Sequence, residues 1–557
     1  MQLNGSQIII ECLVEQGVDT VFGYPGGAVL NIYDELYKNA DRITHILTSH
    51  EQGASHAADG YARSTGKVGV CIATSGPGAT NLVTGIATAY MDSSPIVAIT
   101  GNVTTGLLGK DSFQEVDISG ITMPITKHNY IVKDINELAD TIREAFQIAR
   151  SGRPGPVLID IAKDVTDSKN IIEYTPKKIN FETPARQIPV IYDYQLEEVA
   201  KLISASKKPF IYAGGGVIRS KASEELNEFA NMLNIPTSTS LMGIGAFDQT
   251  NPLSTGLIGM HGTVASNKAV VECDLLIALG VRFSDRVLSN RLHFAENAKI
   301  IQVDIDRAEI DKNIKTDLSL VMDLKEFFVR IKKYLKPKTN PEWVAEVETW
   351  KNVFKNNQVS DSLKPRYFME VIDEVTNGDC YIATEVGQHQ LWAAQYFKYR
   401  MPNRLITSGG LGTMGFGMGA AIGTQVGNPN ATVFNIAGDG SFRMNFNELL
   451  TASKYNIPII VVVANNGVLG MVRQWQTAFY GKRYSQTILD TKLDYEALAK
   501  AFGVDYYYAD NKKDYKNAII NAVKNRRPTI INAIVDTDEK VLPMVAPGKP
   551  IDDIMLK

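Results

Sequence analysis

The chain has 557 residues, of which 44% are hydrophobic and 21% are charged, and its formal net charge is −4. This length is too great for one hydrophobic core and predicts about two to four domains. Because the charge is nearly balanced, we expect neither a nucleic-acid partner nor a membrane surface. The four cysteines lie far apart without a Cys-x-x-Cys pair, which argues against zinc and disulfides and favours the reducing cytoplasm.

Short apolar strands alternate with helical patterns along most of the chain. Residues 1–18 have the pattern of an amphipathic helix and lack the basic segment and long apolar core of a secretory signal. Strands that are apolar on both faces, with helices between them, indicate parallel sheets, so the predicted fold class is α/β. The predicted strands are residues 68–74, 94–100, 156–161, 208–214, 274–280, 298–305, 431–438, 457–465 and 528–535.

Two polar segments, residues 164–190 and 334–364, interrupt this alternation and are predicted to be surface linkers. They divide the chain into predicted domains at 1–170, 188–335 and 362–557. We expect three doubly wound parallel-sheet domains. The first and third share a rhythm of helix, glycine-rich turn and strand–loop–helix units, which indicates a common fold.

A Gly-Asp-Gly motif at residues 438–440 ends one predicted strand, and an Asn-Asn pair at residues 465–466 ends the next. The carboxyl ends of neighbouring parallel strands meet at one edge of a sheet, so the two motifs can lie together. Carboxylate and amide oxygens suit Mg²⁺, and a helix expected to open at Ser441 would offer free N–H groups to a diphosphate. The alternative is two ordinary turns, which fits Gly-Asp-Gly alone better than it fits the pair.

The spacing of these motifs resembles the thiamine-diphosphate motif of thiamine-dependent enzymes. The resemblance extends along the chain and narrows to the acetohydroxyacid synthase (acetolactate synthase) large catalytic subunit family. It implies that Asp439 and Asn466 bind Mg²⁺ through their side chains, and Val468 through its backbone carbonyl. It also implies that the first and third domains are of the thiamine-diphosphate-binding type.

Glu51, within TSHEQGASHAADGYAR (48–63), follows a predicted strand and opens a helix. Glycine and alanine keep this helix thin, so another chain or a cofactor can pack closely. From the residues alone, a capping glutamate is as good an interpretation as a functional one. The segment resembles the family's glutamate segment, which implies that Glu51 hydrogen-bonds the aminopyrimidine of thiamine diphosphate. In that family the glutamate and the metal site come from different subunits, so a homodimer or tetramer with active sites at the interface is implied.

Further segments that carry the resemblance imply roles beside the cofactor. Core packing is the alternative for Met471 in GMVRQWQ (470–476). The polar neighbours of Trp475 indicate a half-exposed side chain, which by resemblance lines the pocket for the second substrate. The implied catalytic residues are Glu51, Gln114, Lys163, Met471 and Trp475. The implied thiamine-diphosphate contacts are Gly27, Glu51, Gln388, His389, Gly412, Met414, Gly440 and Ser441.

The middle domain offers a second cofactor site. Its YAGGGV turn (212–217) follows a strand, which alone is a weak indication of a Rossmann-like nucleotide site. With three later segments it resembles the FAD-binding part of the same family. Arg282 and Arg286 could instead pair with Asp285 on a solvated face. The implied FAD residues are Arg153, Gly214, Gly215, His261, Arg282, Asp285, Arg286, Asp304 and Asp323.

The resemblance implies a carboligase of branched-chain amino-acid biosynthesis. It would decarboxylate pyruvate on thiamine diphosphate and add the hydroxyethyl carbanion to a second 2-keto acid. Pyruvate would give 2-acetolactate, and 2-oxobutyrate would give 2-aceto-2-hydroxybutyrate. An arginine, Arg473 or a neighbour, should hold the second carboxylate. FAD would be structural because no net redox change occurs, and a regulatory small subunit is expected.

Three alternatives remain from the sequence. A catabolic acetolactate synthase would, as a family, lack FAD and the tryptophan of GMVRQWQ, so the presence of both features favours the biosynthetic type. A pyruvate oxidase of the same superfamily would use FAD for redox chemistry. A non-catalytic thiamine- or flavin-binding regulator belongs to another class, and the intact Glu51, Asp439 and Asn466 count against it.

Overall fold

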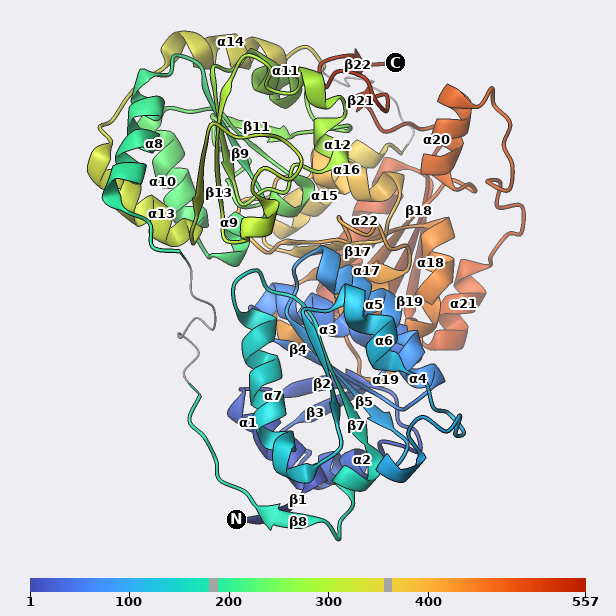
Figure 1. Ribbon diagram of the computed structural model, residues 1–557. Coiled ribbons are helices and arrows are strands. Elements are labelled where there is room, and N and C mark those ends of the chain that lie inside the picture. The colour runs from blue at the N-terminus through green and yellow to red at the C-terminus, as the bar shows by residue number, and fades with distance from the viewer. Residues whose placement is uncertain (180–188, 355–362) are drawn as a thin grey trace.

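The computed structural model describes residues 1–179, 189–354 and 363–557. Three six-stranded sheets, each covered by helices, follow one another along the chain. Figure 1 shows the first at the bottom in blue, the second at the upper left in green and the third at the right in orange. We call each sheet with its helices the N-terminal, central or C-terminal unit. The predicted fold class, α/β with three doubly wound parallel sheets, is confirmed.

The N-terminal sheet has apolar side chains on both faces. Helices α1 (Gly5–Glu15), α2 (Leu30–Lys38) and α7 (Ile135–Arg150) cover one face. Helices α3 (Glu51–Thr65), α4 (Pro77–Asn81) and α5 (Val83–Met91) cover the other. Its parallel strands pair in the order β3 (Thr44–Leu47), β2 (Thr20–Gly23), β4 (Gly69–Ala73), β5 (Ile96–Asn102), β7 (Val157–Ala162) and β6 (His128–Val132).

The first strand of the central sheet along the chain lies in the middle of the sheet. The next two strands lie on one side of it, and the last three lie on the other side. Helices α8 (Asp193–Ala205), α10 (Ser223–Leu233) and α13 (Leu324–Ile331) cover one face. Helices α11 (Val264–Glu272) and α14 (Pro341–Lys351) cover the other. The parallel strands pair in the order β11 (Ser254–Leu257), β10 (Thr237–Thr239), β9 (Pro209–Ala213), β12 (Leu275–Leu279), β13 (Lys299–Asp304) and β14 (Leu318–Val321). This is the strand order of a dinucleotide-binding sheet.

The C-terminal sheet repeats the strand order of the N-terminal one, so the predicted common fold is present. Helices α15 (Pro365–Thr376), α16 (Gln388–Tyr396) and α22 (Lys512–Asn525) cover one face. Helices α17 (Phe416–Gly427), α18 (Asp439–Asn445), α19 (Leu449–Lys454) and α21 (Tyr495–Phe502) cover the other. The parallel strands are, in order, β16 (Leu405–Ile406), β15 (Tyr381–Thr384), β17 (Val433–Gly438), β18 (Ile459–Asn465), β20 (Thr529–Ile534) and β19 (Asp505–Ala509).

Local sequence explains these elements. All seven residues of β5 are buried, as expected for a central parallel strand covered on both faces. In α7 the apolar residues recur every three or four positions, so that Leu138, Ile142 and Phe146 face the core. Asp134 accepts the N–H of Asn136 and caps the start of this helix. No helix in the described ranges combines the length and apolarity needed to cross a bilayer.

Helices α3 and α17 pack closely and join the N-terminal unit to the C-terminal unit (Figure 1). A Cβ on Gly60 would lie 2.1 Å from the carbonyl oxygen of Ala420, and a Cβ on Gly423 would lie 1.8 Å from that of Ala57. Only glycine allows backbones to approach so closely. The small residues of α3 therefore permit close packing, as the sequence predicted, and the helix that packs against them is α17 of the same chain.

The predicted linkers fall partly on residues 180–188 and 355–362, which lie outside the described ranges. In the described part, β8 (Ile171–Glu173) pairs antiparallel with β1 (Gln2–Asn4). Residues 341–351 form α14, whose Trp343 is 2% exposed and donates its indole N–H to the Pro209 carbonyl. The linker prediction is wrong over α14 because this charged segment buries one apolar face against the central unit.

Candidate active site

Most of the predicted site residues lie at the carboxyl edges of the three sheets, where ligands bind in open parallel sheets. The edge of the N-terminal sheet carries Gly27, Glu51, Gln114 and Lys163. The edge of the C-terminal sheet carries Gln388, His389, Gly412, Met414, Asp439, Gly440, Ser441, Asn466 and Val468. The edge of the central sheet carries Gly214, Gly215, His261, Arg282, Asp285, Arg286, Asp304 and Asp323.

Asp439 and Asn466 lie near each other because β17 and β18 are adjacent and parallel, with Gly438 opposite Ala464. Asp439 Oδ2 accepts the backbone N–H of Gly467 at 2.9 Å. Asp439 is 2% exposed, and burial raises the pKa of its carboxyl to about 6, an effect that a bound cation would oppose. One carboxylate and one amide fit Mg²⁺, which needs few protein ligands. The described residues hold no cluster of three His, Cys, Asp or Glu side chains suited to a metal ion.

The turn around Asp439 fits an anionic group. Helix α18 begins at Asp439, two residues before the expected Ser441. A Cβ on Gly438 would lie 2.8 Å from His389 Nδ1, so the turn needs glycine. His389 Nε2 is buried without a hydrogen-bond partner among the described residues, and burial lowers the pKa of His389 to about 3. A buried ring nitrogen without a partner fits a cofactor atom at this edge.

Gln388 and Asn466 already take part in one hydrogen-bond network. Asn466 Nδ2 donates to Gln388 Oε1 at 3.3 Å, and Asn466 Oδ1 accepts the N–H of Val468 at 3.2 Å. Gln388 Nε2 donates to Gln474 Oε1 at 3.0 Å. The network links the turn after β18 to α20 (Gly470–Phe479), so it orients the proposed metal ligands and the helix that carries Trp475 together.

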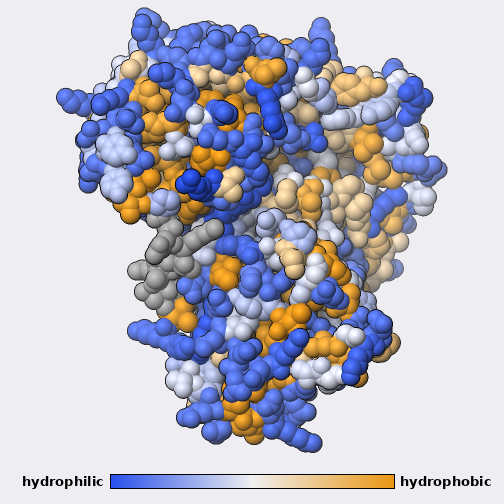
Figure 2. All heavy atoms as spheres, in the orientation of Figure 1, coloured by the Kyte–Doolittle hydropathy of each residue, from blue (hydrophilic) through white to orange (hydrophobic). Residues whose placement is uncertain are grey.

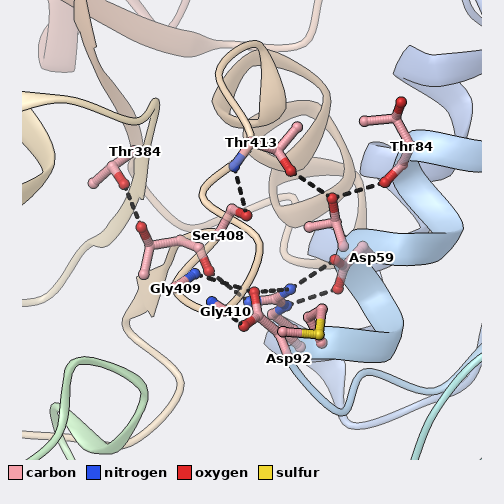
Figure 3. Close-up of polar contacts among 12 residues, drawn as sticks. Asp59, Thr84, Asp92, Thr384, Ser408, Gly409, Gly410 and Thr413 are labelled. Carbon is pink, nitrogen blue, oxygen red and sulfur yellow. Dashed lines mark hydrogen bonds and ion pairs between the residues drawn. The ribbon is translucent and has the colours of Figure 1, made fainter. Parts of the chain in front are cut away.

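The loop at residues 407–415 carries the predicted pyrimidine contacts and is anchored by the N-terminal unit. Asp92 accepts the N–H groups of Gly409 and Gly410 at 3.2 and 2.7 Å (Figure 3). The same carboxylate pairs with Arg63 at 3.2 Å, and Arg63 Nη1 donates to the first carbonyl of the loop at 2.7 Å. Both side chains are buried, so the N-terminal unit fixes a loop of the C-terminal unit.

Glu385 anchors the other end of this loop. It is 1% exposed at the end of β15 and accepts the N–H groups of Gly415 at 2.6 Å and Met418 at 3.0 Å. Burial raises the pKa of Glu385 to about 7. Between the two anchors, Leu411 is 44% exposed, and a Cβ on Gly412 would have no atom nearer than 4.0 Å. The middle of the loop is therefore open to a ligand while its ends are fixed.

Glu51 begins α3 and is 9% exposed. Its Oε2 atom accepts the Asn81 amide at 2.9 Å, and a Cβ on Gly78 would lie 3.2 Å from Oε1. The backbone of Gln114 packs against the same glycine-rich turn. In the described part of the chain, no hydrogen bond or ion pair joins Glu51 to the group around Asp439.

A cleft of about 2910 Å³ lies between the units and is far larger than an ordinary ligand pocket of about 1,000 Å³. Met471 and Trp475 of α20 line it together with Gly412. Every predicted FAD residue except Gly214 also lines it, namely Arg153, Gly215, His261, Arg282, Asp285, Arg286, Asp304 and Asp323. The structure thus brings the predicted flavin residues and the predicted substrate-side residues to one space.

The central edge of this cleft fits a dinucleotide. Its sheet changes direction between β9 and β12, where such sheets bind dinucleotides. Asp304 ends β13, and burial raises the pKa of its carboxyl to about 6. His261 Nδ1 is buried and has no partner among the residues described. Asp323, by contrast, already caps α13 by accepting the N–H groups of Lys325 and Glu326.

The arginines at the cleft differ in their partners. Arg153 reaches from the N-terminal unit to Glu309 of the central unit at 2.8 Å. Arg282 Nη1 donates to the Met91 carbonyl at 2.7 Å, so the alternative of pairing with Asp285 is wrong for this residue. Arg286 is exposed and lies 3.9 Å from Asp285, as that alternative states.

Met471 and Trp475 of helix α20 both line the cleft. The Trp475 ring is half-buried, as predicted, and packs edge-on against Phe479 at 5.6 Å. Arg473 instead pairs with Asp538 at 2.9 Å and lies over the Tyr484 ring. The expectation that Arg473 holds a substrate carboxylate is not supported, because its guanidinium is occupied and it does not line the cleft.

Sequence reasoning missed three polar residues of this site: Asp92, Arg219 and Glu385. Glu385 ends a strand as Asp439 does, so its position was a usable signal. Arg219 closes α9 (Gly215–Arg219) directly after the glycine-rich turn, which was a weaker signal. The sequence around Asp92 gave no signal, because its partners Arg63 and Gly409 lie 29 and more than 300 residues away along the chain.

Three domain families of thiamine pyrophosphate enzymes match the chain. They are the N-terminal TPP binding domain over residues 3–121, the central domain over 196–331 and the C-terminal TPP binding domain over 385–533. The fold and the edges that carry the site therefore define an enzyme of the thiamine pyrophosphate class.

Its relatives narrow the class. The "Probable acetolactate synthase large subunit" of Methanocaldococcus jannaschii is 46% identical over 565 residues, which cover 99% of this chain and 95% of the relative. The "Acetolactate synthase large subunit" of Cyanidium caldarium is 46% identical over 561 residues, 98% of this chain and 95% of the relative. The "Acetolactate synthase" of Arthrospira platensis is 44% identical over 585 residues, which cover 100% of this chain and 98% of the relative. The chain belongs to the acetolactate synthase large-subunit family, and the predicted thiamine-diphosphate-dependent carboligase is confirmed.

Proposed function

We propose that the chain condenses two pyruvate molecules to 2-acetolactate, and pyruvate with 2-oxobutyrate to 2-aceto-2-hydroxybutyrate, with loss of one CO2 each time. These products lead to the branched-chain amino acids. The observation that carries the proposal is the hydrogen bond between Asp439 and Gly467, which joins the two halves of the cofactor motif at one sheet edge. Membership of the acetolactate synthase family supports the reaction type.

Thiamine diphosphate, when bound, supplies the electron sink for decarboxylation and the carbon nucleophile for the ligation. The C-terminal unit would hold it. Asp439, Asn466 and the Val468 carbonyl would bind Mg²⁺, which neutralises the diphosphate. His389 would offer its unpartnered ring nitrogen at the same edge. Gly440, Ser441 and Gln388 would line the diphosphate, and the anchored loop at 407–415 would receive the pyrimidine at Gly412 and Met414.

Glu51 would hold a proton against the pyrimidine ring nitrogen of the cofactor. Its carboxyl is nearly buried, and Asn81 occupies Oε2, which leaves Oε1 for this contact. Gln114 and Gly27 lie at the same sheet edge and would close the site around the cofactor, together with Lys163.

The proposed assembly is a homodimer or tetramer in which Glu51 serves the cofactor bound to a second chain. The absence of a link between Glu51 and Asp439 within the described chain supports it. Exposed apolar residues near Gln114 also support it, since Phe113 is 88% and Met123 67% exposed. Figure 2 shows hydrophobic surface on the flank of the N-terminal unit where α5 and α6 (Ile118–Thr122) lie. Patches of this kind mark interaction sites.

Met471 and Trp475 would act on the substrate side of the cleft. Met471 would pack against the bound thiamine from α20. Trp475 would form a wall of the second-substrate pocket and select the longer side chain of 2-oxobutyrate. FAD would fill the central edge as a structural cofactor, since the reaction has no net redox change. A regulatory small subunit is also proposed, because relatives are named large subunits. The cytoplasm is the proposed compartment, in keeping with four free, buried cysteines.

The test is a competition between the two acceptors. The purified chain is incubated with thiamine diphosphate, Mg²⁺ and FAD, and with equal pyruvate and 2-oxobutyrate, and the products are identified by proton NMR. Mostly 2-aceto-2-hydroxybutyrate supports the biosynthetic role and Trp475 as the selector. Acetolactate alone points to the catabolic type, while acetate or acetyl phosphate with flavin bleaching identifies an oxidase.

A further inference from the structure

Arg219 is a cation without a partner in the large cleft. It is the last residue of α9 and lines the cleft, yet no hydrogen bond or ion pair joins its guanidinium to any residue that the structure describes. The neighbouring arginines are all engaged: Arg63 with Asp59, Arg153 with Glu309 and Arg282 with the Met91 carbonyl. Arg219 is therefore the cleft's available anion-binding group among these arginines.

The surroundings of Arg219 make this charge costly. Burial and the positive charge of Arg63 lower the pKa of Arg219 to about 10, although it stays charged at neutral pH. Asp59 and Asp92 are the nearby acids, but both are bound to Arg63 at 2.7 and 3.2 Å. Asp59 and Asp92 attract Arg219 electrostatically but bond only Arg63, so the guanidinium N–H groups of Arg219 are left for an acceptor from outside the described residues.

The position of Arg219 identifies the anion. Strands β9 and β12 are paired from Leu275 opposite Pro209 to Leu279 opposite Ala213, and the chain leaves them toward opposite edges of the sheet. A dinucleotide lies with its diphosphate across such a switch point. Arg219 lies six residues after the end of β9 and Arg282 three residues after the end of β12, and both line the cleft beside the switch point.

We propose that Arg219 binds the diphosphate of the flavin dinucleotide in the cleft. The proposal rests on the FAD binding proposed above and adds a residue to it. The planar guanidinium can donate to two phosphate oxygens at once, and the bound charge offsets its repulsion with Arg63. The carboxylate of a 2-keto acid offers similar chemistry. It fits less well because the substrate-side residues Met471 and Trp475 lie on α20 of the C-terminal unit.

The experiment measures flavin binding rather than turnover. The full chain, freed of flavin, is titrated with FAD and with riboflavin, which has no phosphate, and flavin fluorescence is followed. Arg219→Met keeps the length of the side chain and removes the charge, and Arg219→Lys keeps the charge and removes the fork. Arg307→Met removes an exposed arginine outside the cleft lining and is the matched control.

We expect Arg219→Met to weaken FAD binding roughly 10- to 100-fold, as the loss of a charge-assisted hydrogen bond would. Riboflavin affinity should stay within about twofold, Arg219→Lys should be intermediate, and Arg307→Met should match the parent chain. Without flavin, Arg219→Met should melt close to the temperature of the parent, because burial disfavours the charge and the repulsion from Arg63 is opposed by the attraction of Asp59 and Asp92.

Two results would overturn the assignment. Unchanged FAD affinity in Arg219→Met with a raised KM for pyruvate would show that Arg219 holds the keto acid. An equal loss of FAD and riboflavin affinity would show that Arg219 shapes the cleft without touching phosphate. If the parent chain binds no FAD, the flavin part of the proposed function fails as well, and the parent titration shows this before any variant is compared.

Discussion

Several carboxyl groups at or just after the ends of strands are buried, and burial raises their pKa values. Burial raises the pKa of Asp439 and Asp304 to about 6 and that of Glu385 to about 7. Asp439 would face the proposed metal, whereas Glu385 accepts two backbone N–H groups, those of Gly415 and Met418. A buried carboxyl group after a strand would thus serve binding at Asp439, whereas at Glu385 it positions a loop.

Glu385 should make stability depend on pH. Its pKa rises from 4.5 in the unfolded chain to about 7 in the folded one, so the folded chain holds the proton more tightly. Its contribution is fully present below about pH 4.5 and is lost as pH rises toward 7, by about 3 kcal/mol at most. Glu385→Gln mimics the neutral acid. The melting temperature of the cofactor-free chain should therefore fall less between pH 5 and pH 7.5 in Glu385→Gln than in the parent. An equal fall in the two proteins would contradict this account.

Glu51→Gln should leave the fold intact, because the amide keeps an oxygen that can accept from Asn81. The amide cannot hold the proton that the pyrimidine needs, so carboligation should fall by about 100-fold or more. Turnover is measured with saturating cofactors, and circular dichroism checks the fold. Near-normal turnover in a folded variant would remove Glu51 from its proposed role.

At the scale of elements, the contact between α3 and α17 depends on glycine. The Gly60→Ala variant would place a Cβ 2.1 Å from the Ala420 carbonyl oxygen. We expect a loss of about 2 kcal/mol of stability, since this clash outweighs the better helix propensity of alanine. Gly106→Ala is the control, because nothing lies within 4 Å of its Cβ. Thermal unfolding should separate the two variants, and equal melting temperatures would mean that α3 and α17 can move apart without cost.

The sequence predicted elements well where one local pattern decides the structure. Continuous apolar runs predicted strands such as β18, because burial on both faces leaves no place for polar residues. The same reasoning failed for α14, whose charged residues hide one apolar face and the buried Trp343. A helix that is charged on most sides and packs on one cannot be told from a linker by composition.

The proximity of Asp439 to the turn of Asn466 was predictable, because β17 and β18 are adjacent strands that also follow each other along the chain. Asp92 and Arg219 were not, because their surroundings form only when distant segments pack. Asp92 contacts the loop at Gly409, which lies 317 positions further along the chain. Such contacts depend on how whole units pack together, and no local spacing encodes them.

At the scale of the whole molecule, the proposed site needs two chains, and mixing can show this. Glu51→Gln and Asp439→Asn should each be nearly inactive alone. If Glu51 serves the partner's cofactor, a random mixture of the two variants contains half heterodimers, each with one intact site. Co-expression should then restore about a quarter of the parent activity. If both residues served one site within a chain, every site would carry a defect and mixing would restore nothing.

The identical strand order of the first and third sheets has a further consequence. In both units the third strand along the chain, β4 or β17, leads into a Gly-X-Gly turn whose middle residue is the first of a helix: Pro77 in one and Asp439 in the other. The C-terminal unit therefore has the carboxylate of Asp439 where the N-terminal unit has Pro77, whose ring leaves no backbone N–H. In the proposed function the C-terminal unit would use this acid for the metal and the N-terminal unit would supply Glu51, so two units with the same strand order would contribute different groups to one reaction.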